Sequence, residues 1–258
     1  MSDNAILERL MYEKNNNVHG GLYHRIQIDF AYNSNHIEGN SLSHEQTRYI
    51  FETNMISMEK NQQCLKIDDI VETANHFFCF DFMLENVNQQ LSETFIKKLH
   101  GYLKRGTADS RTSWFGVGEY KKIPNEVAGR VTTSPEDVQN AIAQLLETYN
   151  KKKSVLFMTI LEFHKKFEDI HPFQDGNGRV GRLIMFKECL KNNIVPFIIS
   201  DDLKYFYYRG LQNWSNEQGF LRDTCLHAQD RFREYLRYFR VYDFDKHSAD
   251  RNTSNSTN

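Results

Sequence analysis

The feature that most constrains the fold is the segment from His171 to Arg182, which lies between two apolar, helix-forming stretches. Residues 155–169 and 179–191 each carry large apolar side chains at helical spacing: Leu156, Ile160, Phe163 and Phe167 in the first, Leu183, Ile184, Phe186 and Leu190 in the second. Between them, Gly176, Asn177 and Gly178 favour a tight turn, because glycine tolerates positive φ. We therefore predict a core unit of helix, short loop and helix, the second helix starting near Arg179.

The loop carries the groups that a nucleotide phosphate site needs. A helix that starts at the glycines offers free N–H groups and its positive dipole end to an anion. Arg179 and Arg182 are three residues apart, so both guanidinium groups lie on one helix face. Asp175 is suited to holding magnesium beside phosphates, and His171 is the group with an unperturbed pKa near neutrality, so it is the natural general base.

Singly, these features are typical of ordinary structure: a capped turn, a tight turn and a solvated arginine face. Together, eight positions follow one pattern, and at about one in twenty per position a chance match is on the order of 10⁻¹⁰ per window. The segment resembles, without a departure, the Fic family motif His-x-Phe-x-Asp/Glu-Gly-Asn-Gly-Arg-x-x-Arg. The resemblance implies a Fic fold over about residues 20–240.

The resemblance also implies roles for the motif residues. ATP would bind with Mg²⁺, which Asp175 would position, and Gly176, Asn177 and Gly178 would hold the phosphates by their amides and side chain. Arg179 would stabilise charge on the β-phosphate and Arg182 would meet the γ-phosphate.

A second motif, residues 34–40, ends the predicted helix 22–36. By itself it is a plain helix end: Gly39 is a good helix stop, and Ser43 with Gln46 predicts a capping box for a helix over residues 44–55. Ser34, Glu38 and Gly39 also resemble the Ser/Thr-x-x-x-Glu-Gly/Asn inhibitory helix of Fic proteins, here N-terminal to the core, the arrangement called class II. That resemblance implies that Glu38 inserts into the nucleotide site and pairs with Arg182.

Between residues 114 and 134 the pattern changes from helical to extended. Residues 119–127 and 131–133 predict a β-hairpin around a turn at 128–130, and Pro124 restricts it to a sheet edge. It is either a surface hairpin without a function or, as the resemblance implies, a flap that holds the target beside His171 by strand addition, with Ile123 and Val127 as flap residues.

The remaining pattern is helical, and the predicted fold class is an all-α bundle with this one hairpin. Further helices are predicted over residues 1–14, 65–87, 95–104, 202–216 and 220–238, and one is opened by Ser134 and Pro135. In the helix 202–216, Tyr207 and Tyr208 resemble the family segment that contacts adenine, and core packing fits either tyrosine equally well. We divide the chain into an N-terminal helical region (1–60), a Fic core (61–244) and a disordered tail (245–258).

Composition excludes several classes of protein. A net charge of −2 gives no reason to expect a nucleic-acid or membrane surface, and no apolar run approaches the roughly 20 residues that span a bilayer. Cys64, Cys79, Cys189 and Cys225 are too far apart for a zinc site, so we expect buried free thiols. The N-terminus lacks the pattern of a signal peptide, and we expect a cytoplasmic protein.

The activity that the resemblance implies is protein adenylyl transfer: AMP passes from ATP to a Ser, Thr or Tyr hydroxyl of a target, His171 takes the hydroxyl proton, and Glu38 inhibits the reaction. One alternative is a hydrolase that removes AMP with Glu38 and His171. The other is a catalytically silent protein that binds partners with a nucleotide-filled site. The target protein, self-modification, the donor base and the oligomeric state, with a homodimer as one option, stay open.

Overall fold

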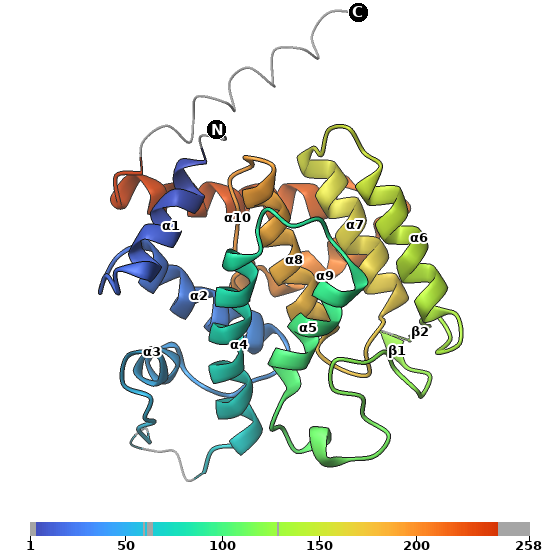
Figure 1. Ribbon diagram of the computed structural model, residues 1–258, viewed down its shortest axis with the longest axis horizontal. Coiled ribbons are helices and arrows are strands. Elements are labelled where there is room, and N and C mark those ends of the chain that lie inside the picture. Colours follow the sequence, from blue (N-terminus) through green and yellow to red (C-terminus); the bar gives the residue numbers. More distant parts are fainter. Residues whose placement is uncertain (1–3, 59, 61–63, 128, 242–258) are drawn as a thin grey trace, which may run out of the picture.

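The computed structural model describes residues 4–58, 60, 64–127 and 129–241. Over this part the chain is a bundle of α-helices with one two-stranded antiparallel hairpin, which confirms the predicted fold class (Figure 1). The helices are α1 (Ala5–Asn15), α2 (Leu22–Ile37), α3 (His44–Thr53), α4 (Ile67–Glu85), α5 (Glu93–Lys104), α6 (Val138–Asn150), α7 (Phe157–Ile170), α8 (Asn177–Lys191), α9 (Lys204–Gln212) and α10 (Gly219–Tyr238).

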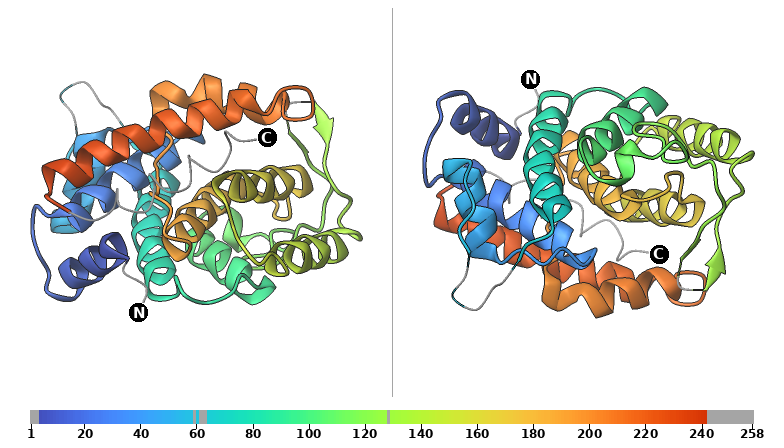
Figure 2. Two further views of the ribbon diagram at one scale, coloured as in Figure 1. Left: turned by 90° about the horizontal axis from the view of Figure 1, so that it is seen from above. Right: turned by 90° about the horizontal axis from the view of Figure 1, so that it is seen from below.

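Helix α8 lies at the centre of the bundle. All its residues except Gly178 and Lys191 are buried, as expected of a helix that packs against neighbours on every side. It contacts α7, α4, α5 and α2, and the long α10 closes one side of the molecule (Figure 2). The phosphate loop at the start of α8 is therefore held between elements from both halves of the chain.

The end of α2 is shaped by local sequence signals. Gly39 has a φ of +94°, which stops the helix, and Glu38 is its C-cap residue. Ser43 and Gln46 form the predicted capping box of α3. Helices α1 and α2 share one apolar core with α4, α7, α8 and α10, so these two N-terminal helices pack directly on the helices that follow.

The hairpin is shorter than the sequence pattern suggested. Its strands are β1 (Glu126–Val127) and β2 (Arg130–Val131), with Glu126 opposite Val131 and Val127 opposite Arg130. Residues 119–125 are not strand, because the backbone of two of them bonds to the loop: the N–H of Lys121 donates to the carbonyl oxygen of Pro172 (2.9 Å), and the N–H of Ile123 donates to Oε1 of Gln174 (3.3 Å). The carbonyl oxygen of Asn125 still accepts from the N–H of Thr132 (3.3 Å) across the hairpin.

Two other expectations need correction, that Ser134 and Pro135 open a helix and that Cys64 is buried, and a third lies outside the described residues. Helix α6 begins at Val138, since Ser134 bonds to the side chain of Asp137 and a turn precedes the helix. Cys64 is exposed, whereas Cys79, Cys189 and Cys225 are buried free thiols as expected. The predicted disordered tail lies outside the described residues.

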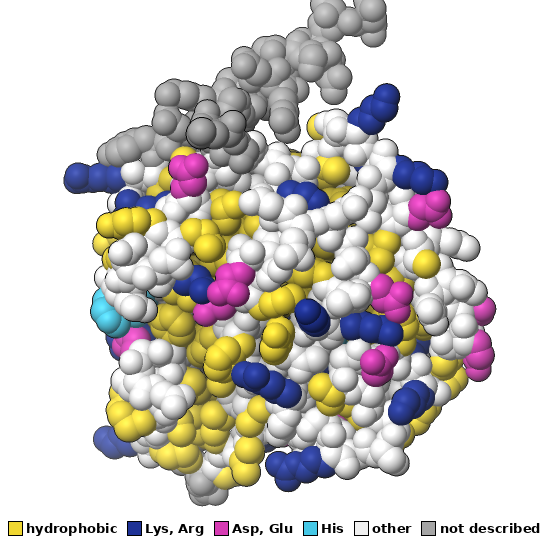
Figure 3. Space-filling view, viewed as in Figure 1, with side chains coloured by type: hydrophobic (Ala, Val, Ile, Leu, Met, Phe, Trp, Pro, Cys, Tyr) yellow, Lys and Arg dark blue, Asp and Glu magenta, His cyan; other side chains and the backbone are white. Residues whose placement is uncertain are grey.

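The surface carries charges of both signs. On the face shown in Figure 3, Lys and Arg side chains are scattered among Asp, Glu and apolar side chains. No helix in the described part of the chain has the length and apolar character needed to span a membrane.

Candidate active site

Two residues with a left-handed backbone conformation and the side chain of one asparagine fix the loop between α7 and α8. His171 ends α7 with φ +51°, and Gly176 precedes α8 with φ +82°. The side chain of Asn177 closes the loop: its Oδ1 accepts from the N–H of Phe173 and its Nδ2 donates to the carbonyl oxygen of Phe173, both at 2.8 Å. Asn177 can therefore offer an anion its backbone N–H, while its side chain supports the loop.

His100 of α5 packs against the loop and supports it. Its ring stacks on Phe173 with a centroid distance of 4.0 Å and an interplanar angle of 2°. Its Nδ1 accepts from the N–H of Gly118 at 2.9 Å, so Nε2 carries the proton and donates to the carbonyl oxygen of Asp175 at 3.2 Å. Burial lowers the pKa of His100 to about 3, so this ring is a neutral structural group.

His171 has the protonation state of a general base. Burial lowers its pKa to about 4, and the nearby Lys121 cation acts in the same direction, so the imidazole is neutral at pH 7. Its Nδ1 has no hydrogen-bond partner among the described residues, and the carboxyl oxygen Oε2 of Glu168 lies 4.0 Å away. Burial and the negative charge of Glu38 raise the pKa of Glu168 to about 8, so this carboxyl group is largely protonated at neutral pH.

Arg182 is held by the end of α2. Its Nε donates to Oγ of Ser34 (3.0 Å), and its Nη2 donates to the carbonyl oxygen of Ser34 (2.8 Å) and to Oε1 of Glu38 (2.7 Å). The pairing of Glu38 with Arg182 that the resemblance implied is thus present. Position 178 must be glycine in this state, because an added Cβ would overlap the carboxylate of Glu38.

Arg179 and Asp175 belong to a network of four charges. Asp175 Oδ2 accepts from Lys104 Nζ (2.6 Å) and from Arg179 Nη2 (3.0 Å), while Glu72 of α4 pairs with both Lys104 and Arg179. Burial alone would raise the pKa of Asp175, but the attraction of Arg179 and Lys104 prevails and lowers it far below its usual range. Asp175 is therefore ionised at any ordinary pH.

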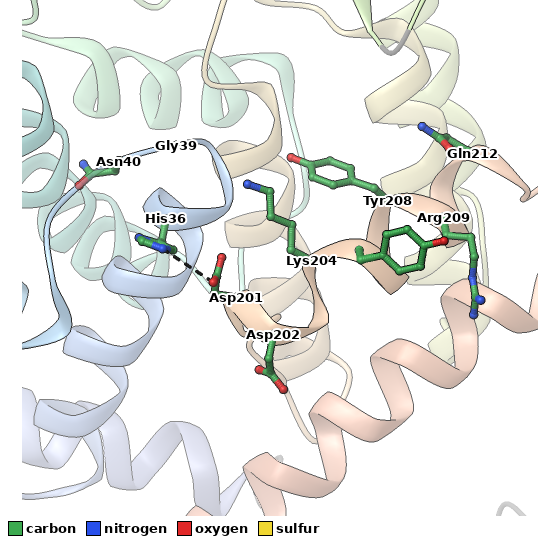
Figure 4. Close-up of a pocket in the computed structure, with 10 residues that line it drawn as sticks. His36, Gly39, Asn40, Asp201, Asp202, Lys204, Tyr208, Arg209 and Gln212 are labelled. Carbon is green, nitrogen blue, oxygen red and sulfur yellow. Dashed lines mark ion pairs between the residues drawn. The ribbon is translucent and has the colours of Figure 1, made fainter.

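A cavity of about 830 Å³ opens beside the turn that carries Glu38. Its lining comes from the end of α2 and from α9 with the residues before it: His36, Gly39, Asn40, Asp201, Asp202, Lys204, Tyr205, Tyr208, Arg209 and Gln212. Figure 4 shows Lys204 and Tyr208 pointing towards the turn at Gly39, and the ion pair of His36 with Asp201 (3.7 Å) at one side. Of the two predicted tyrosines, Tyr208 lines this cavity, whereas Tyr207 is buried in the core with its hydroxyl 2.6 Å from Nε2 of His164.

The hairpin segment lies against the loop. Besides the two backbone contacts described above, Nδ2 of Asn125 donates to the carbonyl oxygen of Phe173 (3.1 Å). Lys121 Nζ donates to Oγ1 of Thr132 (2.6 Å) and to the carbonyl oxygen of Ile170 (3.3 Å), which ties both sides of the hairpin to the residue before His171. Ile123 is exposed and Val127 is partly exposed beside this attachment.

Part of the chain matches a known protein family. Residues 90–189 match the model described as the Fic/DOC family. The chain carries a Fic domain.

Solved structures share its fold beyond that stretch. A Fic domain containing signaling protein from Bacteroides thetaiotaomicron has a TM-score of 0.67 at 24% identity, over 91% of this chain and 93% of the other. The Fic-1 fragment of residues 134–508 from Caenorhabditis elegans also has a TM-score of 0.67, at 22% identity, over 90% of this chain and 70% of the other.

Curated relatives of this Fic domain are longer proteins. The protein adenylyltransferase Fic of Aedes aegypti is 30% identical over 192 residues, which is 72% of this chain and 36% of that protein. The protein adenylyltransferase fic-1 of Caenorhabditis elegans is 25% identical over 222 residues, 80% of this chain and 41% of that protein. The chain thus spans less than half the length of these relatives.

Four residues that support the site of this Fic domain are not predicted by the motifs of the sequence: Glu72, Lys104, His100 and Glu168. Each lies on a helix, at a position where the sequence predicts an ordinary polar side chain. Glu168 had a local signal, since it lies three residues before His171 on the same helix. The others come from α4 and α5, and only packing brings them to the loop.

Proposed function

We propose that this Fic domain is a protein adenylyltransferase that moves AMP from ATP to a Ser, Thr or Tyr hydroxyl of a target protein. The observation that carries the proposal is the loop itself. It presents a neutral His171, the free N–H groups at the start of α8, and two buried arginines within one site. The relatives named as protein adenylyltransferases support the same reaction.

The chemistry follows from the charge and protonation of these groups. His171 accepts the proton of the attacking hydroxyl, the hydroxyl oxygen bonds to the α-phosphorus, and the bond to the β-phosphate breaks with release of pyrophosphate. Arg179, Arg182 and the helix N–H groups stabilise the charge that develops on the phosphates. We assign the cavity beside the turn at Gly39 to the base and ribose end of the nucleotide, because it is lined by Gly39, the residue after Glu38, and by Tyr208.

The residues fit a magnesium ion that arrives with the nucleotide. The described residues contain no group of three or more His, Cys, Asp or Glu that could form a protein cage for a metal. Mg²⁺ needs no such cage when substrate phosphates supply ligands, and Asp175 is ionised and half exposed, with both of its ion pairs on Oδ2. Bound there, Mg²⁺ would neutralise phosphate charge.

We further propose that Glu38 inhibits the transfer reaction by holding Arg182. Glu38 and Ser34 occupy Nε and Nη2 of Arg182 and leave Nη1 without a partner among the described residues, so the arginine cannot hold the γ-phosphate with two nitrogens while Glu38 is in place. ATP can enter without that contact, but its α-phosphate is then not set for in-line attack on the target side. This contact supports the assignment to class II, which the motif at residues 34–40 implied by resemblance.

One experiment tests the activity. Purified wild type, Glu38→Gly and Glu38→Gly/His171→Ala proteins are incubated with a cell lysate and ATP labelled on the α-phosphate. We expect covalent label in protein with Glu38→Gly and none with the double variant, while calorimetry shows ATP affinity within a few-fold for both. If the double variant still labels protein, His171 is not the general base. If Glu38→Gly labels no protein, the proposed adenylyl transfer is wrong.

Hydrolytic removal of AMP is the second candidate. It is favoured by one observation: burial lowers the pKa of His171 to about 4, and the negative charge of Glu38 acts on that imidazole in the opposite direction, so the two groups belong to one site. The same proteins, incubated with a target that already carries labelled AMP, separate the two reactions.

A further inference from the structure

Four charged side chains form a closed ring at the phosphate site. Glu72 (α4) and Asp175 (the loop) are the carboxylates, Lys104 (α5) and Arg179 (α8) are the cations, and each carboxylate contacts both cations. The side chains of Lys104 and Arg179 are each 3% exposed, that of Glu72 is 12% exposed, and that of Asp175 is 49% exposed. The ring therefore meets solvent mainly at Asp175.

Stability alone is a weak explanation for such a ring. Taking ions out of water is costly, and apolar side chains of similar volume often stabilise a fold as well as a buried ion pair does. The ring also leaves a donor unused: Arg179 binds Glu72 by Nη1 and Asp175 by Nη2, while its buried Nε has no hydrogen-bond partner among the described residues. A buried charged donor without a partner indicates that a ligand supplies the missing hydrogen-bond acceptor.

We propose that Glu72 and Lys104 are positioning residues of the phosphate site, which hold Arg179 and Asp175 in place and balance their charges before the nucleotide binds. This inference rests on the proposed function. Glu72 fixes the guanidinium of Arg179 by one nitrogen, and Lys104 fixes the carboxylate of Asp175 by Oδ2. Arg179 Nε then remains for a phosphate oxygen, and Asp175 Oδ1 remains for the cation that accompanies it.

Charge balance gives the two residues opposite effects on binding. The ring sums to zero net charge, two carboxylates against two cations. Loss of Lys104 makes it negative, which repels free nucleotide and attracts a divalent cation. Loss of Glu72 makes it positive, which attracts free nucleotide but releases Arg179 from its anchor.

The test uses the Glu38→Gly protein, in which Arg182 is open, and adds Lys104→Met or Glu72→Gln. ATP affinity is measured by calorimetry in EDTA and again in MgCl₂. In EDTA we expect Lys104→Met to weaken binding about tenfold and Glu72→Gln to tighten it by a similar factor, as single charges within about 8 Å of the phosphates would do. The gain in affinity from MgCl₂ should be larger with Lys104→Met and smaller with Glu72→Gln.

Measuring kcat separates the effect of holding Arg179 in place from the effect of net charge on ATP affinity. Glu72→Gln should lower kcat for self-labelling at least about tenfold although ATP binds no more weakly, because Arg179 is no longer held. The double variant Glu72→Gln/Lys104→Met restores the net charge, so its affinity in EDTA should return to within about twofold of the parent while kcat stays low. If Lys104→Met alone does not fold, the double variant still tests the inference through its EDTA affinity and its kcat.

Matched controls lie on the same two helices. Lys98→Met on α5 and Glu85→Gln on α4 change exposed charges away from the ring and should leave affinity and kcat unchanged. The inference is overturned if both ring variants shift the affinity in the same direction, if neither shifts it, or if Glu72→Gln keeps the parent kcat. If Glu38→Gly binds ATP but labels no protein, the proposed function fails instead, and the affinities still decide the charge balance.

Discussion

Replacing Glu38 by glycine should activate the protein. Glu38 supplies one of three contacts that hold Arg182, a charged hydrogen bond of 2.7 Å, and its side chain is only 28% exposed. A charged hydrogen bond of this kind is worth roughly 1.5–3 kcal/mol, and each 1.4 kcal/mol is about tenfold in rate. We therefore expect Glu38→Gly to raise AMP transfer by about tenfold to a hundredfold.

The measurement is the initial rate of label transfer from α-labelled ATP, to the protein itself and to lysate proteins. Glu38→Gln should give a smaller gain, since the amide can still accept from Arg182 without the charge. Glu85→Gly is the matched control: it removes a glutamate at the end of another helix, whose ion pair with Lys14 lies on the surface, and should change nothing.

Two results would contradict this prediction. If Glu38→Gly raises labelling of neither itself nor the lysate, the contact with Arg182 is not inhibitory. If Glu38→Gly instead abolishes the removal of AMP from a labelled target, Glu38 serves the hydrolytic reaction.

Three further predictions concern pH and the hairpin. Because burial lowers the pKa of His171 to about 4, the rate of the Glu38→Gly protein should hold from pH 7 to about 5 and fall only below that, and a midpoint near 6.5 would contradict the buried base. A lysine in place of Ile123 or Val127 should suppress target labelling more than self-labelling if the target docks there, whereas Val131→Lys on the opposite strand should not; equal losses of both reactions would indicate misfolding. Glu168 has a folded-state pKa of about 8, above its unfolded value of 4.5, so its contribution to stability is full below about pH 4.5 and is lost as the pH rises through about 8. Urea unfolding should therefore show a larger loss of stability between pH 6 and pH 8 in wild type than in Glu168→Gln, and equal losses would contradict the raised pKa.

Local sequence predicted the elements of the site well. The apolar spacing around residues 160 and 184 placed α7 and α8, and the glycines placed the loop, because helix periodicity and positive φ are properties of a few neighbouring residues. The structure starts α8 at Asn177, two residues before the predicted start, since the side chain of Asn177 is used to close the loop. The hairpin was less predictable, because the backbone N–H groups of Lys121 and Ile123 bond to the loop and not to a partner strand.

Neighbouring residues alone specify which groups exist and which of them lie close along a helix: His171, the glycine turn, the two arginines on one face, and a helix end at Gly39. Which distant charges meet depends on how the helices pack. Glu72 and Lys104 are spaced like solvated surface residues, and nothing local distinguishes them from exposed charges such as Glu85 and Lys98. Their burial against Asp175 and Arg179 follows from how α4 and α5 pack on α8, and the energy of a charge depends on its depth and its partners in space, which sequence spacing does not encode.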